Sequence, residues 1–137
     1  MESHLELNDD LFEEEFAACT LDPKIFSHEA HMRLAWIHIK KYGVDRAVEN
    51  ICIQLVAYVE HLGSRNKFNK TLTVAAIYAV NHFINRSHTN TFKDLIEEFP
   101  RLKFNFKDLM AAHYGIDIYT SPAAKENFMQ PDLLPFS

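Results

Sequence analysis

The order of apolar and polar residues along the chain predicts helices almost throughout. The clearest pattern spans residues 44–62, where apolar side chains recur every three to four positions and charged residues fill the opposite face. The apolar positions are Val44, Val48, Ile51, Cys52, Leu55, Val59 and Leu62. Gly43 precedes this stretch and Gly63 follows it, and glycine is common where helices end.

Similar spacing predicts helices on both sides of this one. Residues 27–42 follow the N-cap residue Ser27, and residues 71–86 are apolar nearly all round, which is typical of a helix inside a bundle. Shorter helices are predicted over 9–19, 91–98 and 106–113, with a last one starting at Ser121 and Pro122. Their N-cap candidates are Asn8 or Asp9, Thr91 and Asn105.

No stretch alternates as a β-strand does, so the predicted fold class is all-α. We expect one helical domain over residues 1–137, a bundle of about four main helices with short C-terminal helices. Residues 1–8 are expected to be flexible. The two prolines of residues 129–137 predict an extended tail.

The charge balance narrows the range of partners. The 137 residues include 19 acidic and 14 basic ones, a net charge of −5, which disfavours nucleic-acid binding. No apolar run is long enough to span a membrane, and the N-terminus lacks the basic and apolar regions of a signal peptide. Cys19 and Cys52 lie in apolar patterns and are expected to be reduced thiols, with one disulfide between them as the alternative. These features predict a cytoplasmic protein.

Candidate chemistry centres on His28 and His31, three residues apart at the start of the 27–42 helix. This spacing places two imidazoles on neighbouring turns, where they can share a divalent metal ion. His28 falls within the apolar arc of its helix, so we expect its ring to turn inward and to need a polar partner. The alternative is that both histidines are structural and satisfied locally.

Three further residues are candidates for the same site. Glu15 leans toward the apolar side of the 9–19 helix. Tyr78 and His82 share one face of the 71–86 helix and are candidate ligand-binding residues. Each also has an ordinary structural reading, as a solvated acid or as a polar residue at the edge of a core.

The segment "FAACTLDPKIFSHEAHMRLAW" resembles an uncharacterised family of small bacterial proteins that read approximately F-E-x-C-T-L-P-x-x-x-[FW]-x-H-x-x-H. Downstream, "FNKTLT" is similar to the family's Y-H-E-T-L-T. The resemblance implies a site of one glutamate and three histidines in typical members. His28 and His31 match that set, whereas Ala17 replaces the glutamate and Asn69 the third histidine. Asn69 is therefore expected to bind a ligand by hydrogen bonding.

These observations predict a helical protein that binds a small molecule or a divalent metal in an interior His-lined pocket. The predicted ligand-binding residues are His28, His31, Asn69, Tyr78 and His82, and the predicted metal ligands are His28 and His31. The alternative is an interaction or homodimerisation module that uses the C-terminal "QPDLLPF". An enzyme with a histidine base is a third interpretation, but no catalytic constellation is recognisable.

Overall fold

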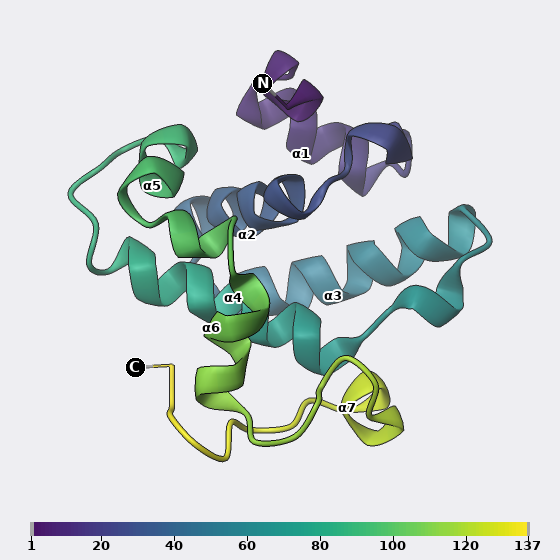
Figure 1. Ribbon diagram of the computed structural model, residues 1–137. Helices are drawn as coiled ribbons and strands as arrows, with labels where there is room; N and C mark the ends of the chain where they lie inside the picture. Colours follow the sequence, from purple (N-terminus) through teal and green to yellow (C-terminus); the bar gives the residue numbers. More distant parts are fainter. Residues whose placement is uncertain (1, 137) are drawn as a thin grey trace. The chain divides into compact units, whose positions relative to one another are not determined.

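The computed structural model describes residues 2–136, which are built of helices and loops (Figure 1). It contains seven α-helices, is 67% helical and has no strand in this range. The all-α prediction is confirmed. The chain forms two compact units, the first ending at Phe68 and the second beginning at Asn69. Whether they act as one domain stays a prediction. None of the helices within residues 2–136 has the length and apolar character that crossing a membrane requires.

The first unit is organised by a helical hairpin. Its elements are η1 (Ser3–Glu6), α1 (Asp9–Ala17), η2 (Pro23–Ile25), α2 (His28–Tyr42), α3 (Val44–His61) and η3 (Arg65–Lys67). Gly43 alone separates α2 from α3. Its φ of +85° is one that residues other than glycine rarely adopt. The chain therefore reverses there, and α3 runs back along α2 (Figure 1). Helix α1 packs on both.

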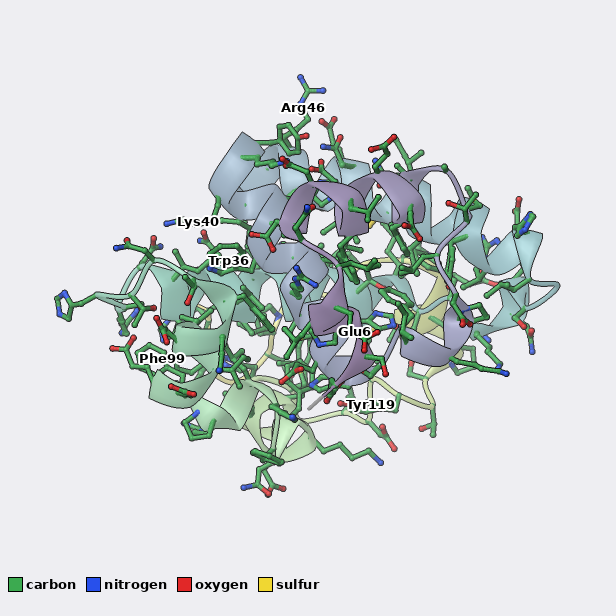
Figure 2. All side chains as sticks on the ribbon, turned by 90° about the horizontal axis from the view of Figure 1, so that it is seen from above. Glu6, Trp36, Lys40, Arg46, Phe99 and Tyr119 are labelled. Atoms are coloured by element: carbon green, nitrogen blue, oxygen red, sulfur yellow. The ribbon has the colours of Figure 1, made fainter. Side chains whose placement is uncertain are left out.

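The core of the first unit contains a cluster of aromatic rings. Phe12 and Phe16 from α1 are fully buried, and the Phe16 ring lies 4.9 Å from that of Tyr58 on α3. The Tyr58 hydroxyl donates to the Leu21 carbonyl at 2.8 Å, and burial raises the pKa of Tyr58 to about 12. Charged side chains of the same hairpin, such as Lys40 and Arg46, extend outward (Figure 2). The unit thus has the apolar interior that its helical pattern predicts.

The second unit begins with α4 (Lys70–Ile84) and continues through α5 (Phe92–Glu98), η4 (Pro100–Leu102), α6 (Phe106–His113) and α7 (Pro122–Glu126). Helix α4 packs against α7, while α5 and α6 both contact η4. Residues 129–136 contain no helix, and their backbone amides form hydrogen bonds with the rest of this unit. The Met129 amide donates to Thr71 Oγ1 at 3.0 Å, and the Leu133 amide donates to the His113 carbonyl at 3.0 Å. The final residue of the predicted tail lies outside the described residues.

Most predicted helix starts are confirmed by a capping side chain. The amide protected in each case lies three residues after the cap, as it does in N-capped helices generally. The capping residues are Asn8, Ser27, Thr91 and Ser121. Asn105 precedes α6 as predicted, but it has a left-handed φ of +62° and its side chain does not cap the helix. Helix α1 ends at Ala17, earlier than predicted, because Cys19 has a left-handed φ of +61°.

The N-terminal segment departs from the prediction of a flexible start. Ser3–Glu6 form a 3₁₀ helix, and the His4 side chain is fully buried. Its ring nitrogen Nε2 lies 2.6 Å from Glu29 Oε2. Arg33, only 5% exposed, donates to the carbonyls of His4 at 2.6 Å and Leu7 at 2.7 Å. A buried guanidinium thus holds the segment to α2.

The Arg33 network predicts a large effect of one substitution. Arg33 also donates to Asp9 Oδ1 through Nη2 at 2.9 Å and through Nε at 3.2 Å. Arg33→Leu would remove the guanidinium from the Asp9 carboxylate. It would also remove the donors that the carbonyls of His4 and Leu7 accept from. We expect a loss of about 2–4 kcal/mol in the free energy of unfolding, measured by urea denaturation.

The matched control is Arg46→Leu, which alters an exposed arginine on α3 whose nearest carboxylate contact, Glu49 Oε2, is 3.9 Å away. This variant is expected to stay within about 0.5 kcal/mol of the wild type. Equal stabilities for the two variants would contradict the assigned role of Arg33.

Candidate functional site

The structure corrects the predicted orientation of His28. Its side chain is exposed rather than turned into the core of the first unit. The helix begins at His28, and the apolar arc of α2 is filled by residues farther along the helix, such as Ala30, Met32 and Ala35. His31 is half-buried and stacks on Phe26, with ring centroids 3.9 Å apart and planes at 24°. Burial, with a smaller contribution from His28, lowers the pKa of His31 to about 4.

Metal binding by this pair remains a prediction. A neutral His31 at pH 7 leaves a nitrogen lone pair available, which is what a metal ligand requires. Among residues 2–136, however, no third His, Cys, Asp or Glu joins the two histidines in a compact ligand group. Structural zinc sites use four ligands and catalytic ones generally three, so two imidazoles alone would bind weakly.

One compact group of potential metal ligands does occur in the described part of the chain, formed by Glu2, His4 and Glu29. Their nearest ligand atoms all lie within 4.8 Å of one another. The His4 Nε2 atom is 2.6 Å from Glu29 Oε2 and 3.7 Å from Glu2 Oε1. Ser27 Oγ also donates to Glu2 Oε1. The sequence reasoning missed this group because Glu29 lies 25 residues from His4 in the chain.

The surroundings of His4 favour a hydrogen-bonded network over a metal site. To coordinate a metal through Nε2, a neutral imidazole must carry its proton on Nδ1. That nitrogen lies 3.4 Å from Arg33 Nη1, which is itself a donor. The arrangement instead suits a proton on Nε2 that is donated to Glu29. We therefore assign the group to fixing η1 on α2.

Glu15 has a local structural role. It is half-buried, and its backbone carbonyl accepts hydrogen bonds from the amides of Thr20 at 2.9 Å and Leu21 at 3.1 Å. These bonds close the turn that follows α1. Among residues 2–136, Glu15 belongs to no compact group of three or more potential metal ligands.

The burial of His31 predicts a pH-dependent stability. Its pKa is about 4 in the folded chain and near 6.5 in the unfolded chain, so the unfolded state binds the proton first as pH falls. Stability is therefore complete above pH 6.5 and decreases between pH 6.5 and 4. We expect this residue to account for a loss of about 1–3 kcal/mol over that range.

Replacing His31 with phenylalanine tests this assignment, since the variant keeps an aromatic ring against Phe26 but cannot titrate. Urea denaturation at pH 7 and pH 4.5 should show a smaller acid loss for His31→Phe than for the wild type. The exposed His88→Phe serves as the control. An unchanged pH dependence in His31→Phe would contradict the assignment.

Asn69 occupies a structural position in the second unit. Its Oδ1 caps α4 by accepting from the Leu72 amide at 3.0 Å, and its Nδ2 donates to the Ile118 carbonyl at 2.8 Å. Both ends of the amide are thus engaged within the unit. The prediction that Asn69 binds a ligand stays untested, and its geometry is accounted for by the fold alone.

Two substitutions of Asn69 separate its contributions. Asn69→Ala removes the cap and the bond to Ile118, and should lower the free energy of unfolding by about 1–3 kcal/mol. Asn69→Ser keeps a capping oxygen but cannot reach Ile118, so about half of the loss should return. A fully stable Asn69→Ala protein in urea denaturation would argue for a role outside the fold.

Tyr78 and His82, which the sequence places on one helix face, meet a common neighbour in the second unit. Phe136 stacks near Tyr78, with ring centroids 6.2 Å apart and planes at 23°. The backbone of Phe136 also hydrogen-bonds to His82. His82 is half-buried and lines a cavity. Tyr78 is not among the lining residues, but its ring contacts that of Phe136, which is.

This cavity in the second unit has a volume of about 510 Å³. It lies between α4, η4, α6 and the C-terminal segment. Its lining includes four cationic or titratable groups, His82, Arg86, Arg101 and His113, together with apolar residues. The apolar members are Ala79, Phe83, Leu109, Ala112, Leu134, Pro135 and Phe136. The sequence prediction had identified only His82 among them.

Contacts within the lining hold several of these groups in place. Arg86 follows the end of α4 by two residues, and its Nη1 lies 3.1 Å from His82 Nδ1. His113 Nδ1 lies 2.8 Å from the Leu134 carbonyl, and its ring stacks on Phe136 at 4.2 Å. Burial lowers the pKa of His82. The hydrogen bond with the Phe136 backbone raises this pKa, whereas the nearby Arg86 and His113 lower it further. His82 is therefore neutral at pH 7.

A second cavity of about 390 Å³ lies in the same unit, along α6 and the loop after it. Its lining mixes charges of both signs, with Lys107 beside Asp108 and Asp117. Lys107 Nζ also lies 5.1 Å above the Tyr119 ring. These internal contacts make it the less distinctive of the two cavities.

Comparison of the chain with protein-family models, curated proteins and solved structures gives no match. The resemblance drawn from "FAACTLDPKIFSHEAH" and "FNKTLT" therefore stays a prediction. The class defined by the structure is that of an all-α protein with a cationic cavity in its second unit. Any function has to be argued from that cavity.

Proposed function

We propose that the protein binds a small organic molecule in the cavity beside His82. The observation that carries this proposal is the lining itself, an apolar wall with a few polar groups that converge on one space. Small-molecule sites generally combine an apolar lining with a few polar groups and have volumes of about 300–1,000 Å³. The cavity volume of about 510 Å³ falls in this range.

The proposal keeps the predicted function but moves its location. The His-lined pocket expected around His28 and His31 is replaced by one that includes His82 and is supported by Tyr78 through Phe136. Nothing in the lining forms a nucleophile with an adjacent base, so we propose binding rather than catalysis. The composition supports a cytoplasmic location as part of the proposal.

The alternative of an interaction module is supported by two residues of the C-terminal segment. Leu133 and Leu134 are 57% and 56% exposed, more than is usual for adjacent leucines. Phe136, in contrast, is buried in its own unit. This alternative also stays a prediction, and it concerns the same segment that borders the cavity, since Leu134 is part of the lining.

Filling the cavity tests the proposal. Ala112 lines it and is half-buried, so Ala112→Trp should occupy the space that a ligand needs. We expect benzoate and benzamide, used as small aromatic probes, to shift amide signals around His82 and His113 in ¹H–¹⁵N spectra of the wild type. In Ala112→Trp the apparent affinity for the probes, measured from these shifts, should be at least about tenfold lower.

The matched control is Ala111→Trp, a neighbouring position on α6 that lines the smaller cavity instead. This variant should bind the probes as the wild type does. Absence of any probe-dependent shift in the wild type would contradict the proposed function. Loss of binding in Ala111→Trp with retention in Ala112→Trp would place the binding site in the smaller cavity and would contradict the proposal.

A further inference from the structure

The larger cavity has an unusual charge for this protein. Its lining contains two arginines and two histidines but no aspartate or glutamate. The chain as a whole carries 19 acidic residues against 14 basic ones. The cavity lining is therefore a local reversal of the net charge, and both of its arginines are exposed to solvent.

Neither cavity arginine is neutralised by the part of the chain that the structure describes. Arg86 and Arg101 form no ion pair with a carboxylate there, whereas Arg33, Arg46 and Arg65 each lie within 4 Å of one. Arg86 donates toward the ring nitrogen and carbonyl of His82, at 3.1 and 3.5 Å. These contacts engage Nη1 and leave its other guanidinium donors for a ligand.

The apolar part of the lining indicates what would accompany the charge. Phe83 and Phe136 contribute rings to the wall, and the His113 ring lies nearly parallel to that of Phe136, with planes at 27°. Phe83 is itself held against Phe99 at 4.8 Å. Flat, fixed rings next to guanidinium groups suit a ligand with a planar apolar body and a charged end.

We infer that the natural ligand is a small oxyanion, a carboxylate or a phosphate monoester, whose charged end contacts Arg86 and Arg101 and whose apolar body lies against Phe83 and Phe136. Guanidinium groups bind both kinds of oxyanion through paired, charge-assisted hydrogen bonds. This inference rests on the proposed function, because it names the ligand class of the same cavity.

Three probes of one size test the inference in the full-length protein by isothermal titration calorimetry and ¹H–¹⁵N spectra. Benzoate and phenyl phosphate carry the two candidate oxyanions, and benzamide is a neutral analogue of benzoate. We expect both anions to bind at least about tenfold more tightly than benzamide. The tighter of the two anions then identifies the preferred oxyanion.

Charge-matched variants assign the effect to the cavity. Arg86→Gln and Arg101→Gln should each weaken benzoate binding about tenfold and leave benzamide binding unchanged. Arg46→Gln changes the net charge equally but lies in the first unit, and should have no effect.

The outcomes separate the two proposals. Equal binding of benzoate, phenyl phosphate and benzamide in the cavity would overturn the anion inference while leaving the proposed function intact. An equal loss of benzoate affinity in Arg46→Gln would also overturn it, because the effect would then be one of net charge. Failure of all three probes to bind would overturn the proposed function and this inference with it.

Discussion

Burial of the Arg33 guanidinium is the constraint on which the first unit depends most. A charged group in an interior position is tolerated only when its donors are satisfied, and here Asp9 and the carbonyls of His4 and Leu7 supply the acceptors. These acceptors come from the N-terminal segment and the start of α1, so their geometry fixes that segment on α2. The ring of Phe12, 4.8 Å from the guanidinium carbon, completes the enclosure.

The second unit places two other arginines on a cavity wall, where both are exposed. Arg33 shows how this chain satisfies a guanidinium when a carboxylate is available. Arg86 and Arg101 line a cavity whose walls supply none, and Arg86 instead contacts the imidazole of His82. A guanidinium group binds an oxyanion through paired, charge-assisted hydrogen bonds, and the exposed side chains of Arg86 and Arg101 are accessible for this. Because burial lowers the pKa of His82, this residue adds hydrogen-bonding groups to the cavity without adding charge at pH 7.

The helices were predictable from the sequence because their signals are local. Ser27 and Ser121 act as caps through bonds to amides three residues ahead, and Gly43 reverses the chain by its own backbone angle. The early end of α1 at Ala17 was not predictable, because cysteine gives no warning of a left-handed conformation. The buried His4 was missed for another reason, since its partner Glu29 lies 25 residues away.

The site was predictable only in part. Spacing on one helix identified Tyr78 and His82, and could have identified Arg86 one turn further on. Arg101 and His113 reach the cavity from other elements, and the inward turn expected of His28 was wrong.

The most direct test of the account follows the arginine side chains themselves. In the wild-type protein, the Nε–H signals of Arg86 and Arg101 can be observed by NMR while benzoate is added, with those of Arg46 and Arg65 as internal references. The account predicts saturable shifts of the first two signals and none of the references. Shifts of equal size in all four, or a response confined to Arg46 and Arg65, would contradict an anion site in the second unit.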